Sequence, residues 1–84
     1  MGYNILLTGS QIRAGRALLR WTARDLADKA GIGIQTIHRA EAVDDVPSMT
    51  SRTLTKIHNA FASSGIVFDG DSGVRREDWT TEAG

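Results

Sequence analysis

Hydrophobic side chains recur at helical spacing in four stretches of this chain, and the pattern changes near its end. The four stretches cover residues 11–20, 23–30, 34–42 and 50–63. Within each, apolar residues lie three or four positions apart, which places them on one side of an α-helix. A β-branched and aromatic run after Gly65, a group of turn-forming residues and a second short run then predict a β-hairpin over residues 65–77. The sequence therefore predicts a mainly all-α fold, with four helices and a small C-terminal hairpin.

Residues at the expected helix ends support these boundaries. Ser10 is placed to cap the first helix, Thr22 the second, and Thr50 or Ser48 the fourth, because their hydroxyls can accept hydrogen bonds from free amides at a helix start. Gly31 stands just past the second helix, where a residue with positive φ is needed.

The junction between the second and third helices is the most specific feature of the chain. Two helices that cross steeply over a short turn need close backbone approach. Ala27 offers only a methyl group at the crossing, Gly31 has no side chain, and Ile37 fills the angle from the third helix. The polar residues Gln35, Thr36, His38 and Arg39 fall on the other side of that helix.

The segments DLADKAG (25–31) and TIHRAE (36–41) resemble the helix-turn-helix of the lambda-repressor/Cro-like (XRE-type) family of DNA-binding regulators. The resemblance extends from Gln11 to Phe61. It implies a four-helix domain over residues 10–64, double-stranded DNA with an inverted-repeat operator as partner, a homodimer, no cofactor, and an ion pair between Arg16 and Glu41. Two positions depart from the family: Ala23 replaces a glutamine that reaches a phosphate, and Gly33 replaces a capping Ser or Thr.

The polar side of the expected third helix carries groups suited to the major groove, where each base pair presents its own donors and acceptors. Gln35 can pair with adenine and Arg39 with guanine or a phosphate. Thr36 can meet a thymine methyl or a phosphate, and His38 can donate to a base or a phosphate. We expect contacts to the DNA backbone from residues near the helix starts, namely Thr22, Arg24, Ser48, Ser51 and Arg52.

Charge is unevenly distributed although the formal net charge is zero. Residues 1–60 carry eight Lys or Arg against five Asp or Glu, a balance of +3, and residues 61–84 carry two against five, a balance of −3. A basic segment suits a nucleic-acid partner, but this excess is small. An alternative therefore stays open, in which the fold binds a protein, as an anti-activator or antitoxin-like module, and does not itself read DNA.

Other kinds of chemistry find little support. The chain has no cysteine, and His38 and His58 lie on different expected helices, so we expect no metal site. The segment 70–73 (GDSG) matches a protease motif but falls in a hairpin turn, and we expect no enzyme activity. No apolar run approaches the ~20 residues of a membrane span, so we expect a cytoplasmic protein.

Both ends of the chain lie outside these helices. Residues 1–9 are expected to form an N-terminal extension, either a short strand through Tyr3, Ile5 and Leu7 or a loose tail. Residues 78–84 are expected to be a mobile acidic tail, in which Trp79 docks on another surface. The hairpin, which is marginal alone in water, is the candidate dimerisation element.

Overall fold

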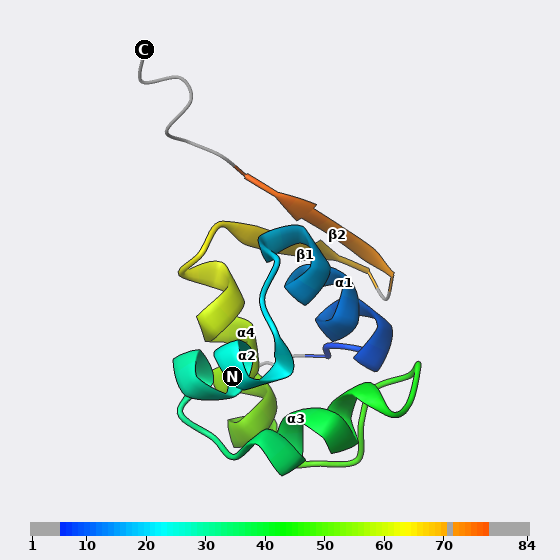
Figure 1. Cartoon of the computed structure of the whole chain (residues 1–84). Coiled ribbons are helices and arrows are strands. Elements are labelled where there is room, and N and C mark those ends of the chain that lie inside the picture. Colours follow the sequence, from blue (N-terminus) through cyan, green and yellow to red (C-terminus); the bar gives the residue numbers. More distant parts are fainter. Residues whose placement is uncertain (1–5, 71, 78–84) are drawn as a thin grey trace.

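The computed structural model describes residues 6–70 and 72–77 and contains four helices followed by an antiparallel hairpin. The elements in chain order are α1 Gly9–Leu19, α2 Ala23–Ala30, α3 Ile34–Glu41, α4 Ser51–Ala62, β1 Ile66–Asp69 and β2 Gly73–Arg76. Figure 1 shows the hairpin across the top of the molecule and α3 at the bottom, on the opposite side. These elements confirm the prediction of a mainly helical fold with a small hairpin.

Helices α2 and α3 begin at the residues that the sequence indicated, and α4 begins one residue later than predicted, at Ser51. Thr22 and Thr50 cap α2 and α4 by accepting hydrogen bonds from Asp25 N and Thr53 N. Gly31 takes the left-handed conformation, φ 72°, at the end of α2. Gly33 precedes α3 without a side-chain hydrogen bond, because glycine has no group to offer.

The first helix starts earlier than predicted, so the assignment of Ser10 as its cap is wrong. Thr8 is the cap: its hydroxyl accepts from Gln11 N, and the Gln11 side chain accepts in return from Thr8 N, each at 3.1 Å. The helix ends at Leu19 rather than Arg20, which adopts the left-handed conformation with φ 59°. The pattern Thr-x-x-Gln at residues 8–11 is that of a capping box, and it indicates the helix start that the structure shows.

A single core lies where the helices meet. Its fully buried members come from every helix and from both ends of the described chain, and include Leu7, Ile12, Leu26, Ile37, Ile57 and Phe61. The Phe61 ring stacks on Trp21, with centroids 5.8 Å apart. A Cβ on Gly15 would lie 2.9 Å from that ring, so this glycine allows α1 and α4 to approach.

The N-terminal segment does more than extend the chain. Leu7 is buried in the core and Thr8 caps α1, while Leu6–Thr8 form no strand. Most of the strand predicted through Tyr3, Ile5 and Leu7 falls on residues 1–5, outside the described residues. The predicted acidic tail and the docking of Trp79 also lie outside them.

Hydrogen bonds from one buried side chain and apolar packing join the hairpin to the helices. Gln11, only 1% exposed, donates from Nε2 to the carbonyl oxygens of Gly70 and Gly73, each at 3.0 Å. Ile66 is buried in the core, and Phe68 and Val74 pack against it. The two strands pair in the register Ile66↔Arg76 through Asp69↔Gly73. The hairpin is therefore an integral part of the fold.

Candidate nucleic-acid interface

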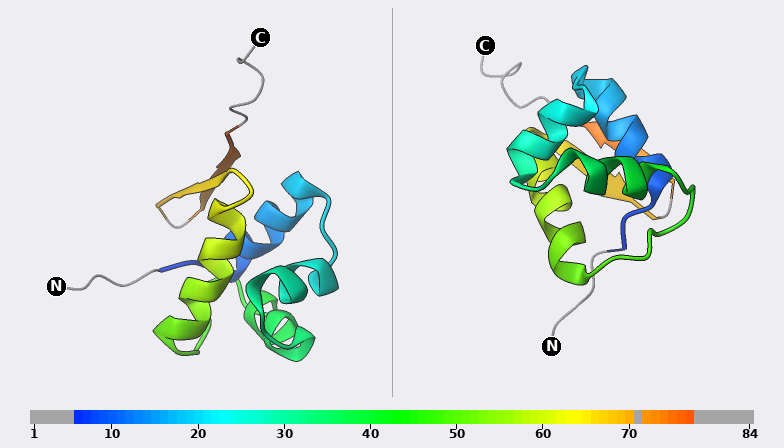
Figure 2. Two further views of the ribbon diagram at one scale, coloured as in Figure 1. Left: turned by 90° about the vertical axis from the view of Figure 1, so that its left-hand side faces the viewer. Right: turned by 60° about the horizontal axis from the view of Figure 1, so that its bottom comes forward.

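Helix α3 has one side in the core and one side at the surface. Ile37 and Ala40 are completely buried, whereas Gln35, His38 and Arg39 are exposed. Thr36 is half-buried in the first turn, where its amide donates to Gly33 O. When the bottom of the molecule is turned forward, α3 lies across its front with no other described element over it (Figure 2). Three of the four predicted base-reading residues are therefore presented to solvent.

The turn before α3 holds it at a fixed angle to α2. The three residues from Gly31 to Gly33 join the two helices, and the amide of Ile32 donates to Ala27 O at 3.0 Å. Ala27 is buried where the helices contact each other. The small residues named from the sequence therefore occupy the junction.

A two-pronged ion pair fastens the end of α3 to α1. Arg16 donates from Nε and Nη2 to the two carboxylate oxygens of Glu41, at 2.7 and 2.8 Å, and from Nη1 to Trp21 O at 2.9 Å. The pair is largely enclosed, with side-chain exposures of 24% and 10%. The hydrogen bond to Glu41 raises the pKa of Arg16 above its ordinary value. The pair that the resemblance implied is present.

Arg13 makes a second connection at the same end, which sequence reasoning missed. Its guanidinium donates to Glu41 O at 2.6 Å, close to the free carbonyls that end α3, and to the Asp44 carboxylate at 2.6 Å. This hydrogen bond lowers the pKa of Asp44. Helical periodicity could not indicate these contacts, because the acceptors of Arg13 lie at the end of α3 and in the loop after it, both distant in sequence.

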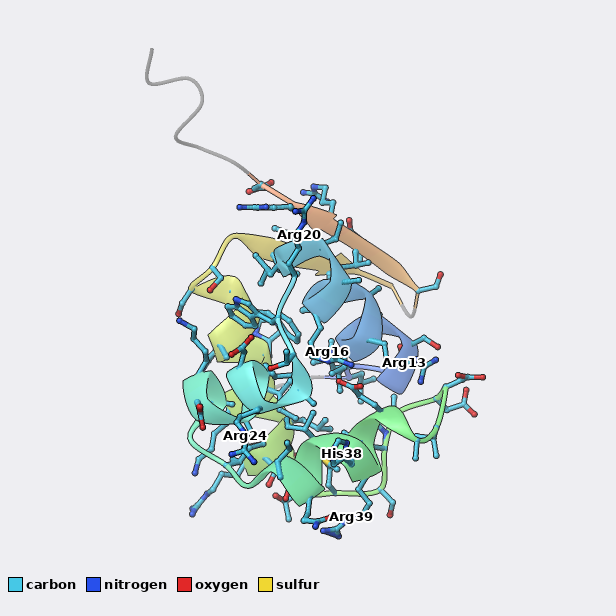
Figure 3. The ribbon with its side chains drawn as sticks, in the orientation of Figure 1. Arg13, Arg16, Arg20, Arg24, His38 and Arg39 are labelled. Atoms are coloured by element: carbon cyan, nitrogen blue, oxygen red, sulfur yellow. The ribbon has the colours of Figure 1, made fainter. Side chains whose placement is uncertain are left out.

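Among the described residues, these internal pairs leave more basic than acidic side chains without an ion pair. Arg13, Arg16 and Arg75 together engage Glu41, Asp44, Asp69 and Glu77. Within residues 6–70 and 72–77, the basic side chains that make no ion pair are Arg20, Arg24, Lys29, Arg39, Arg52, Lys56 and Arg76. Figure 3 places Arg24, His38 and Arg39 around α2 and α3 in the lower half, and Arg20 at the top beside the hairpin.

The start of α2 is less open to a phosphate than the sequence suggested. Thr22 N donates to the Asp25 carboxylate at 2.9 Å, and the Thr22 hydroxyl accepts from Asp25 N at 3.0 Å. The hydrogen bond from the Thr22 amide lowers the pKa of Asp25 and keeps it negatively charged. The amide and the hydroxyl oxygen of Thr22, a predicted contact to the DNA backbone, are thus both bound to Asp25, an anion. Arg24, exposed and without an ion pair among the described residues, stays available.

The start of α4 is more accessible to a phosphate than the start of α2. Ser48, Ser51 and Arg52 are all exposed, and the first turn of α4 contains no acidic residue. The capping hydroxyl of Thr50 is used by Thr53 N at 3.2 Å. The predicted backbone contacts Ser48, Ser51, Arg52 and Arg24 therefore present accessible groups.

The loop between α3 and α4 has an apolar and acidic surface, unlike the start of α4. Val43 and Val46 are 43% and 40% exposed, and the carboxylates of Asp44 and Asp45 lie between them in sequence. Hydrogen bonds from Gly9 N and Ser10 N to carbonyls of Asp45 and Asp44 fix the loop to α1. Its apolar and acidic surface suits a protein better than a phosphate backbone.

Metal binding finds no support in the described part of the chain, where no three His, Cys, Asp or Glu gather in a group that could hold an ion. His38 is exposed on α3, whereas the Nδ1 atom of His58 is buried on α4 without a hydrogen-bond partner among the described residues. Across the same residues, no helix has the length and apolar character needed to cross a membrane.

Comparison with known proteins does not assign a family to this chain. No family model matches the sequence, and no curated protein matches it either.

Proposed function

We propose that α2, the turn and α3 form a helix-turn-helix and that the chain is a sequence-specific DNA-binding transcriptional regulator. In this proposal α3 enters the major groove of double-stranded DNA. The observation that carries the proposal is that α3 has a buried apolar side and an exposed polar side. Its apolar side packs in the core. Gln35, His38 and Arg39 point outward and make no hydrogen bond or ion pair with the described residues. A major groove accepts a helix with these properties.

The exposed side chains have complementary chemistry. Arg39 presents a fork of donors that suits the O6 and N7 acceptors of guanine, and Gln35 can donate to and accept from adenine in the same plane. One turn apart on the helix, the two can address neighbouring base pairs. His38 can donate to a base or a phosphate. Thr36 is half-buried, so only the exposed part of its side chain can contact DNA.

Phosphate contacts would fix the register of α3 in the groove, because they position a protein without reading sequence. Arg24 at the start of α2 and Arg52 at the start of α4 flank α3 in the chain and lack ion-pair partners among the described residues. The Arg16–Glu41 pair and the Arg13 contacts would hold α3 rigid against α1. Occlusion of a promoter by such a bound domain would make the protein a repressor.

Selection of duplexes from a random DNA pool tests the proposal. The expected result is enrichment of one sequence, arranged as an inverted repeat if two copies bind together. The Arg39→Ala variant should then bind the selected duplex about 5–150-fold more weakly, the equivalent of about 1–3 kcal/mol for one lost two-pronged base contact. Failure to enrich any sequence would overturn the proposal.

Arg20→Ala is the matched control, since Arg20 is also exposed and makes no ion pair within the described residues, but lies beside the hairpin (Figure 3). This substitution removes the same charge as Arg39→Ala. The affinity for DNA should change by less than about threefold, because salt screens long-range charge interactions. Equal losses in both variants would show that general electrostatic attraction, rather than base reading, accounts for binding. Thermal melts of both variants check that each is folded.

A second candidate function is protein binding by the same fold. The loop between α3 and α4 favours it, because Val43 and Val46 are exposed beside two carboxylates. Salt dependence separates the two candidates. DNA binding weakens steeply as salt rises, with a slope of about −0.9 per phosphate neutralised in a plot of log affinity against log salt. A chain that shows no measurable duplex binding even at low salt would support the protein-binding alternative.

A further inference from the structure

Helix α4 carries two basic side chains on its exposed side. Its buried residues Leu54, Ile57 and Phe61 show which side of the helix faces the core. Arg52 and Lys56 are both exposed and lie on the opposite side, because residues four positions apart share one side of a helix. They are about 6 Å apart along the helix axis, at 1.5 Å per residue. Lys56 has no role in the contacts proposed above.

The positive charge on this side of α4 is not offset within the described chain. The helix contains no Asp or Glu. Neither Arg52 nor Lys56 makes an ion pair with a described residue. The acidic residues that precede the helix, Asp44 and Asp45, lie in a loop that is hydrogen-bonded to the start of α1, where Asp44 contacts Arg13. The exposed side of α4 therefore presents two cations to whatever it meets.

Helix α2, by contrast, is electrically balanced. Its two basic and two acidic residues sum to zero, whereas the two basic residues of α4 sum to +2. Asp25 stands at the start of α2, where the hydrogen bond from the Thr22 amide lowers its pKa and keeps it negatively charged. DNA is a polyanion, so its backbone is attracted more strongly to α4 than to the start of α2.

The direction of α4 brings both cations toward the level of α3. Figure 1 shows α4 beginning beside α3 at the bottom of the molecule and ending near the hairpin at the top, and the left view of Figure 2 agrees. Side chains on a helix lean toward its N-terminus. The long side chain of Lys56, one turn above Arg52, therefore leans toward the end of α4 that lies beside α3.

We propose that the phosphate contacts extend along α4 to Lys56, and that Arg52 and Lys56 each neutralise one phosphate of the duplex that receives α3. This inference rests on the proposed function, because it specifies which part of the domain binds the DNA backbone. The added contact lies beyond the first turn of α4, to which the expected backbone contacts on that helix were confined. It carries no sequence information, since a phosphate is the same at every base pair.

The salt dependence of duplex binding by Lys56→Gln tests the inference. Each phosphate neutralised contributes about −0.9 to the slope of log affinity against log salt. Lys56→Gln should therefore have a slope less steep than that of wild type by about 0.9. It should weaken binding to the selected duplex and to a scrambled duplex of the same length by the same factor. Lys56→Arg, which keeps the charge, should retain the wild-type slope.

Lys29→Gln is the matched control. Lys29 is also exposed and makes no ion pair within the described residues, but its Nζ atom lies over the Trp21 ring, 5.5 Å from the ring centroid. Trp21 stacks on Phe61, which in turn contacts Phe68 of β1, so Lys29 is drawn toward the hairpin and away from the start of α4. The slope for Lys29→Gln should equal that of wild type.

The possible outcomes separate this inference from the proposed function. If the wild-type chain binds the duplex and Lys56→Gln has the same slope, the inference is overturned and the proposed function stands. Equal decreases of slope in Lys56→Gln and Lys29→Gln would also overturn the inference, because general charge would then account for them. A wild-type chain that binds no duplex even at low salt would overturn both. Thermal melts check that each variant is folded, as expected for exposed side chains.

Discussion

Replacing Gln11 by methionine tests how the hairpin is joined to the helices. Methionine has a similar length and volume but neither the Nε2 donor nor the Oε1 acceptor. The substitution removes the two 3.0 Å hydrogen bonds to Gly70 O and Gly73 O and the 3.1 Å bond from Thr8 N. Because Gln11 is 1% exposed, water cannot take its place without opening the structure.

The expected loss follows from the number of bonds. At about 0.5–1.5 kcal/mol each, three hydrogen bonds contribute roughly 3 kcal/mol. A chain of 84 residues has a total stability of about 4–13 kcal/mol at ordinary values per residue. The variant should therefore lose a large part of its stability, and its Tm should fall by about 12–24 °C.

Urea unfolding followed by circular dichroism measures the effect. Gln35→Met is the control, because Gln35 is exposed on α3 and the same substitution there should change stability by less than about 0.5 kcal/mol. If Gln11→Met were as stable as this control, the fastening of the hairpin by Gln11 would be refuted.

Three further predictions concern stability. Glu41→Gln should destabilise the fold by about 2–3 kcal/mol, because Arg16 would keep a largely enclosed charge without its anion, and a double-mutant cycle with Arg16→Met should show coupling above about 0.5 kcal/mol. Gly15→Ala should lower stability by about 1 kcal/mol in urea unfolding, since a methyl 2.9 Å from the Phe61 ring costs more than the gain in helix propensity. The pKa of Asp25 is lower in the folded chain than its unfolded value of about 3.9, so its stabilising contribution is present above that pH and is lost as pH falls through the folded pKa. Asp25→Asn should therefore show a smaller decrease of Tm with acid than wild type.

Local features of the sequence predicted local structure well. The Thr22 cap, the positive φ of Gly31 and the limits of α2 all follow from short-range chemistry, and the structure contains them. The same rule applied to α1 selected Ser10, although the Thr8–Gln11 capping box was equally visible. Ser10 stands directly before the periodic apolar residues, and Thr8 lies only two residues earlier, so alternative caps can lie close together in the sequence.

Contacts between distant segments were harder to predict. Gln11 reaches carbonyls 59 and 62 residues away, and Arg13 reaches Glu41 O, 28 residues away. A polar residue on a helix looks the same in sequence whether its acceptor is water or a remote carbonyl. The Arg16–Glu41 pair was anticipated only through the family resemblance. The polar side of α3 followed from helical periodicity alone, which fixes the direction of each side chain once the buried side is known.

NMR mapping of a bound duplex tests whether α3 is the element that contacts DNA. Amide shifts of the isotope-labelled chain would be followed while the selected duplex is added. If α3 enters the major groove, the largest changes should occur at Gln35, His38 and Arg39, with smaller ones at Arg24 and Arg52. Changes confined to the hairpin and α1, with α3 undisturbed, would contradict it.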